Sequence, residues 1–134
     1  VSTRASTDLG YPFNTGATKN ILVSIYTRDD LALAGLTPGT NIVGMELLVT
    51  QQPGKDDDAG GVRQDVKNFR IALGNTDAAS TNTNTLQTSL QQTITQVLVA
   101  PTIVSSSLHT GQWVPFVFGT PWNWVGDRNL LVEV

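Results

Sequence analysis

The sequence predicts a single all-β domain with the architecture of a jelly-roll-like antiparallel β-sandwich carrying one or two short helical turns. Short segments in which apolar and polar residues alternate recur along the chain, as expected for half-buried strands. Turn-forming Gly, Pro, Asn and Asp separate these segments at regular intervals. A chain of 134 residues is long enough to bury one hydrophobic core, and no linker divides it. We therefore expect residues 1–134 to form one domain.

The first half of the chain contains two predicted strands and one predicted helical turn. Residues 21–26 are rich in β-branched and aromatic side chains, which favour strands. Residues 28–34 favour a helical turn, because Asp29 and Asp30 place negative charge at its N-terminal end and Gly35 follows its last residue. In the next strand, four alternating side chains are expected on one face: Val43, Met45, Leu47 and Val49.

The second half contains four further predicted strands. Phe69, Ile71 and Leu73 alternate with Arg70 and Ala72, and residues 96–100 form a short apolar run that Pro101 is expected to end. Residues 113–118 are apolar at every position, which indicates a strand covered on both faces, and residues 130–134 alternate again. We expect these last two strands to form a closing hairpin around a turn-rich aromatic bridge. A weaker helical pattern covers residues 85–91.

Composition and charge exclude several classes of function. Eight basic and eleven acidic residues give a net charge of −3 without any basic cluster, which argues against binding to nucleic acid or to an anionic membrane surface. No run of 18 apolar residues is present, so membrane insertion is not expected. The absence of cysteine excludes disulfides and thiol chemistry. Only 14% of the residues are charged, and an uncharged polar surface of this kind is found in extracellular β proteins.

One acidic loop suggests a calcium site. Calcium prefers several oxygen ligands on a flexible loop, and Asp56, Asp58 and Asp65 could supply them. The loop does not follow the EF-hand pattern, because Gly60 and Lys67 occupy two of the ligand positions. The alternative is a solvent-exposed hairpin loop whose charged side chains only keep it soluble. No other cofactor is predicted.

The tryptophans near the C-terminal end suggest a carbohydrate site. Trp122 and Trp124 share a face if the chain is extended, and Asn123 and Asp127 could donate or accept hydrogen bonds beside them. The alternative is that these rings belong to the core. Trp113 is expected to be buried.

No catalytic set can be assembled from the sequence. His109 is the only histidine and is expected in an exposed loop, so neither a zinc site nor a Ser-His-Asp triad is indicated. Glu46 and Glu133 are the only glutamates, and a glycosidase would need two carboxylates facing one cleft. Both are expected to face outward from strands. We therefore predict that the chain is not an enzyme.

Five sequence blocks occur in a characteristic order: Tyr11-Pro12-Phe13-Asn14, Ile25-Tyr26-Thr27-Arg28-Asp29-Asp30-Leu31 with Ala34-Gly35, Gly39-Thr40-Asn41-Ile42, Phe69-Arg70-Ile71-Ala72-Leu73-Gly74-Asn75-Thr76, and Gly111-Gln112-Trp113 through Thr120-Pro121-Trp122-Asn123-Trp124 to Asn129-Leu130-Leu131-Val132-Glu133-Val134. Taken in this order, the blocks resemble a jelly-roll-like β-sandwich module of secreted and cell-surface proteins of Bacteroidota-type bacteria, often found beside fibronectin type III domains. The chain departs from the family pattern at Asn75 and Trp122, where His and Phe are usual. Family members also continue with a further strand after the position of Val134.

The resemblance implies a secreted or cell-surface protein without an agreed biochemical activity. We therefore expect a non-catalytic extracellular structural or adhesive module, whose partners are other copies of itself or neighbouring domains. Because the family has a further strand, we expect the last strand of this chain to need a neighbour from another segment or subunit, as in a surface polymer joined by strand addition. The alternative function is a carbohydrate-binding module that uses Trp122 and Trp124 to bind a glycan.

Overall fold

The computed structural model describes residues 21–50, 65–78 and 94–134, and the elements within these ranges are almost entirely strands. They are β1 (Val23–Tyr26), α1 (Arg28–Leu33), β2 (Thr40–Leu48), β3 (Val66–Thr76), β4 (Ile94–Ile103), the short 3-10 helix η1 (Ser105–Ser107), β5 (Trp113–Trp124) and β6 (Asn129–Glu133). All of their strand pairs are antiparallel. The predicted all-β, sandwich-like fold is therefore confirmed, whereas its jelly-roll-like connectivity stays a prediction.

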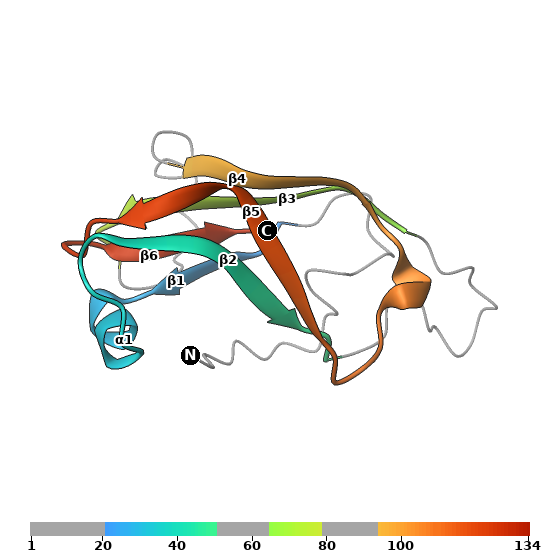
Figure 1. Ribbon diagram of the computed structural model, residues 1–134, viewed down its shortest axis with the longest axis horizontal. Coiled ribbons are helices and arrows are strands. Elements are labelled where there is room, and N and C mark those ends of the chain that lie inside the picture. Colours follow the sequence, from blue (N-terminus) through green and yellow to red (C-terminus); the bar gives the residue numbers. More distant parts are fainter. Residues whose placement is uncertain (1–20, 51–64, 79–93) are drawn as a thin grey trace.

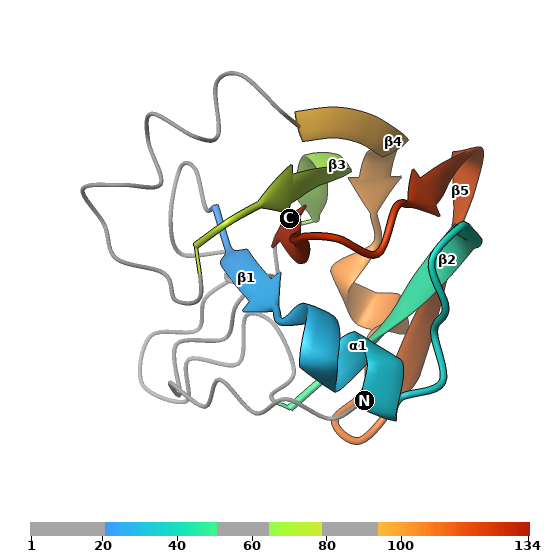
Figure 2. The ribbon, with the colours of Figure 1, turned by 90° about the vertical axis from the view of Figure 1, so that its left-hand side faces the viewer.

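The strands form two sheets (Figure 1). The larger sheet has the order β1-β6-β3-β4, and the smaller consists of β2 and β5. Figure 2 shows the strands nearly end-on, with β4 and β5 as neighbours on one side and α1 between β1 and β2 on the other. The two sheets thus enclose the core between them, and they approach each other most closely along β4 and β5.

β5 pairs with β2 at both of its ends, and its middle approaches β4 of the larger sheet. Residues 113–117 pair with residues 44–48 of β2, and residues 122–124 pair with residues 40–42, so residues 118–121 lie outside this ladder. In the bend, β5 approaches β4 at Gly119 and Val97. Val97 is itself the extra residue of a bulge in β4, opposite the step from Ile71 to Ala72.

The core is built from alternating residues of four strands. Its buried members in the larger sheet are Phe69, Ile71, Leu73, Val97, Leu130 and Val132. The smaller sheet contributes Phe116, Phe118 and Trp124. The rings of Phe69 and Phe116 stack with their centroids 4.9 Å apart and so join the sheets across the core. The alternation predicted for β3 and β6 is confirmed.

The predicted closing hairpin is wrong. β5 pairs with β2, whereas β6 pairs with β1 and β3, so the turn at residues 125–128 carries the chain from one sheet to the other. The reason lies in the core: Trp124 and Leu130 fill it from opposite sheets. β6 is also paired along both edges, with Glu133 opposite Val23 on one side and opposite Ala72 on the other. β6 thus has a strand of this chain on each side, and the prediction that a further strand from another segment or subunit completes the sandwich stays a prediction.

Two further predictions of strand burial are corrected at β2 and β5. Val43 is 59% exposed instead of facing the core with Met45 and Leu47, because the ladder between β2 and β5 shifts its register between Ile42 and Gly44. β5 is not covered on both faces, because its odd-numbered apolar residue Val117 is 76% exposed. β4 also continues through Pro101, which an edge strand tolerates.

The helical turn is confirmed as α1. Thr27 caps it, and its Oγ1 accepts a hydrogen bond of 3.2 Å from the backbone N–H of Asp30. Gly35 follows with a φ of 89°. Leu31 on this helix is buried in the core, so α1 closes the end of the sandwich near β1. The weaker helical pattern at residues 85–91 lies outside the described residues.

Candidate functional site

The predicted carbohydrate platform is not formed. Trp124 is 1% exposed, and its Nε1 donates a hydrogen bond of 3.1 Å to the carbonyl oxygen of Arg128. Trp122 is half-buried and packs against the core. Asn123 faces outward, where its Nδ2 donates to the carbonyl oxygen of Gly39 at 2.9 Å, and Asp127 is exposed in the following turn.

The reason is the alternation of β5. Apart from Thr120, which is exposed in the bend, the even-numbered residues from Val114 onward face the core, and both tryptophans belong to this series with Phe116 and Phe118. With one ring buried and the other packed on the core, no coplanar pair is left to stack on a sugar. The prediction of a platform from Trp122 and Trp124 is therefore wrong.

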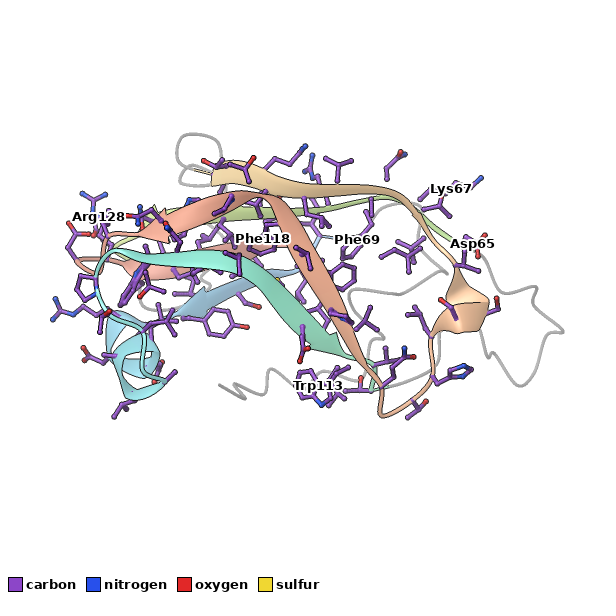
Figure 3. The ribbon with its side chains drawn as sticks, viewed as in Figure 1. Asp65, Lys67, Phe69, Trp113, Phe118 and Arg128 are labelled. Atoms are coloured by element: carbon purple, nitrogen blue, oxygen red, sulfur yellow. The ribbon has the colours of Figure 1, made fainter. Side chains whose placement is uncertain are left out.

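The calcium prediction falls mostly outside the described residues. Asp56 and Asp58 lie there, and Asp65 is exposed immediately before β3 (Figure 3). Within residues 21–50, 65–78 and 94–134, no three His, Cys, Asp or Glu side chains gather in a way that could hold a metal ion. The calcium site thus stays a prediction.

The two glutamates lie on opposite outer faces of the sandwich. Glu46 is exposed on β2, as predicted. Glu133 is on the face of the larger sheet that points away from the core, but it is buried, and its Oε1 accepts a hydrogen bond of 2.9 Å from Nη2 of Arg70. Ala72 and Leu131 are buried on the same face. Glu133 is therefore part of a structural ion pair rather than the exposed residue that the sequence suggested.

Removing Arg70 is expected to destabilise the fold. The variant Arg70→Met leaves the Glu133 carboxylate buried without its cation, and we expect a loss of about 1–3 kcal/mol in the free energy of unfolding, since the half-exposed arginine contributes less than a fully buried partner. Urea unfolding followed by circular dichroism measures this loss. The double variant Arg70→Met/Glu133→Gln should recover part of it, and equal stability of the single and double variants would argue against the buried carboxylate as the cause.

His109 is exposed, as predicted, in the turn that leads into β5. Its backbone N–H donates a hydrogen bond of 3.0 Å to Oε1 of Gln112, which shapes this turn. Glu46 and Glu133 belong to different sheets, and His109 lies outside both sheets, in the turn before β5. In the part of the chain that the structure describes, these residues do not form a common site.

An exposed apolar surface covers the outer face of the smaller sheet. We call it the β2–β5 patch and define it by four residues with their exposed fractions: Val43 59%, Leu48 41%, Trp113 54% and Val117 76%. Figure 3 shows Trp113 at the start of β5, away from Phe118 and Phe69. The burial predicted for Trp113 is therefore wrong, since this ring is the exposed one among the three tryptophans.

The antiparallel register places three of the four patch residues in cross-strand pairs, with a further pair between them. Trp113 is opposite Leu48, Pro115 is opposite Glu46, and Val117 is opposite Gly44. Side chains that are directly opposite in this way lie within contact distance on one face. Glu46 is the one charged residue in these three pairs, and the Glu46–Pro115 pair lies between the other two pairs. The arrangement is thus an apolar strip with a single acidic group near its middle.

The sequence alone could not have identified this patch. Residues 113–118 are apolar at both odd and even positions, so the strand itself does not indicate which face is exposed. Glu46 is the one available signal: it marks the outer face of β2, and its partner in the register then marks the outer face of β5.

None of the helices in the described ranges is long and apolar enough to cross a membrane. Comparison of the chain with protein-family models, with curated proteins and with solved structures found no match.

Proposed function

We propose that this chain is a non-catalytic structural or adhesive module that works outside the cell, and that its β2–β5 sheet binds a strand from a neighbouring domain or from another copy of the chain. The observation that carries the proposal is the β2–β5 patch. Its four side chains are 41–76% exposed on one face of a sheet, and large apolar side chains that gather on an exposed face often mark sites of interaction.

The chemistry of the patch favours a protein partner over a sugar. Exposed Trp113 resembles the rings on which sugars stack, but a sugar site also needs several polar groups that fix the hydroxyls. In the three cross-strand pairs, Glu46 is the one such side chain, and the others are Leu48, Pro115, Val117 and Gly44. Apolar side chains around an exposed tryptophan are typical of protein interfaces.

An extracellular location is supported by the low charge content and by the resemblance of the sequence blocks to modules of secreted proteins. Because the chain has no cysteine, disulfides do not contribute to its stability.

Selection of peptides from a random display library on the purified chain tests the proposal. Peptides that bind should lose about tenfold or more in affinity for the variant Trp113→Ser, since loss of a tryptophan that an interface buries commonly costs about 2 kcal/mol. Val117→Thr should also weaken binding. Val99→Thr is the matched control, because Val99 is a similarly exposed strand valine in the other sheet. Selected peptides that bind all of these variants equally well would overturn the proposal.

A further inference from the structure

The β2–β5 patch contains an acidic group, and a second exposed surface of the chain offers the opposite charge beside an apolar side chain. We infer that the partner of the patch is another copy of this chain, which presents β4 and the adjoining part of β3 through the outer face of its larger sheet. Copies joined in this way add to one another head to tail. This inference rests on the proposed function and names the partner.

The second surface lies on the outer face of the larger sheet, along β4. Because Phe69 faces the core, the next residue, Arg70, and its cross-strand partner Val99 face outward. Val99 is 60% exposed, and Lys67 and its partner Thr102 are exposed further along the same two strands. We call this surface the β3–β4 face and define it by four residues: Lys67, Arg70, Val99 and Thr102.

Lys67 is available to pair with an acidic group of another copy. The three arginines in the described ranges, Arg28, Arg70 and Arg128, each form an ion pair with a carboxylate of the same copy. None of these ion pairs includes Lys67, and none includes Glu46 of the β2–β5 patch. Each of the two surfaces thus carries one charge that is not used by these pairs, and the two charges have opposite signs.

The two surfaces lie on opposite sides of the sandwich, because each is the outer face of a different sheet. Figure 3 shows Lys67 and Trp113 on these opposite sides. One copy can therefore use both surfaces at once, its β2–β5 patch with one neighbour and its β3–β4 face with the next. Repetition of such a heterologous contact generates a filament, or a ring where the rotation between copies closes.

The head-to-tail contact matches the surfaces in both polarity and charge. Val99 adds an apolar side chain to the strip around Trp113, and the long side chain of Lys67 can lie along this strip with its ammonium group at the Glu46 carboxylate. A contact between two β2–β5 patches would instead bring two Glu46 carboxylates together, and the three cross-strand pairs contain no cation. Like charges that face each other at an interface are costly, so charge favours the head-to-tail contact.

Sedimentation velocity of the 134-residue chain, from micromolar to millimolar concentration, tests the inference. The wild-type chain is expected to form species larger than a dimer as the concentration rises. Glu46→Lys and Lys67→Glu should each weaken association about tenfold or more, because each places like charges in the contact. The double variant Glu46→Lys/Lys67→Glu should regain most of the association. Asp127→Lys is the control for net charge, since Asp127 is exposed outside both surfaces.

A mixture of two variants tests whether the contact joins two different surfaces. Trp113→Ser keeps the β3–β4 face intact, and Lys67→Glu keeps the β2–β5 patch intact. Each variant alone is expected to stay monomeric where the wild-type chain associates. The equimolar mixture should form a heterodimer that does not grow, because each copy has one intact surface. A symmetric contact between patches would leave Lys67→Glu associating like the wild-type chain, which would overturn the inference.

The outcomes separate this inference from the proposed function. A wild-type chain that stays monomeric up to millimolar concentration would overturn the head-to-tail contact, while display peptides that depend on Trp113 would still support the proposed function. Association that responds to Trp113→Ser but not to Lys67→Glu would overturn the β3–β4 face as the partner and leave the patch as a binding site. Association that ignores Trp113 and Glu46 would overturn the inference, and display peptides that also ignore Trp113 would overturn the proposed function with it.

Discussion

The variant Trp124→Ala is expected to lose about 3–5 kcal/mol in the free energy of unfolding, the largest effect of any single substitution considered for this chain. Trp124 is 1% exposed and is the largest of the fully buried side chains. Its removal leaves a cavity between the sheets and also removes the hydrogen bond to the carbonyl oxygen of Arg128. Because a domain of this size is stable by only about 5–15 kcal/mol, this loss is a large fraction of its total stability.

The variant Trp113→Ala is the matched control for this prediction. It removes the same side chain from the same strand, but from the exposed outer face. Its cost should stay below about 1 kcal/mol, as for most surface substitutions. Urea unfolding followed by far-ultraviolet circular dichroism measures both variants without depending on tryptophan fluorescence. Equal losses in the two variants would contradict the placement of Trp124 in the core and Trp113 on the surface.

The variant Gly126→Ala is expected to lose about 2–4 kcal/mol. Gly126 has a φ of 84° in the turn that joins the two sheets. A methyl group there would lie 2.6 Å from Cβ and 2.9 Å from Cα of Pro38, and it would also meet Cγ of that ring. Since Cα belongs to the backbone and the ring is rigid, the turn at residues 37–40 must move to make room.

The control for Gly126 separates backbone strain from the steric clash. Gly111 has the same φ of 84°, but the position of its missing Cβ has no neighbouring atom within 4 Å. Gly111→Ala should therefore show the strain of the positive φ alone, about 1 kcal/mol. Thermal or urea unfolding gives both values. If the two variants were equally stable, the packing of the Gly126 turn against Pro38 would contribute nothing.

The patch and the core of β5 are two consequences of one alternation. Phe116, Phe118 and Trp124 face the core, whereas Trp113 and Val117, at odd-numbered positions of the same strand, face solvent. The functional proposals therefore depend on a face that a strand of ordinary composition would fill with polar residues. An apolar outer face lowers solubility unless a partner covers it, which is the physical reason for assigning the binding role to this sheet.

Local signals correctly predicted much of the secondary structure. Alternating residues gave the core faces of β3 and β6, since side chains on a strand repeat every two residues whatever the strand pairs with. α1 was predicted from Asp29, Asp30 and Gly35, because helix ends depend on charges and backbone angles within a few residues. The register shift at Val43 was missed, because a bulge depends on the partner strand as well as on β2 itself.

The sequence by itself therefore determined the class of the fold, the position of most strands and the helix, because these depend on neighbours along the chain. Only the tertiary structure decided that β6 lies between β1 and β3, that Trp124 is buried, and that Trp113 is exposed beside Leu48. These features depend on contacts between residues far apart in the chain. In β5, where both faces are apolar, the packing of Phe116 against Phe69 across the core selects the face that is buried.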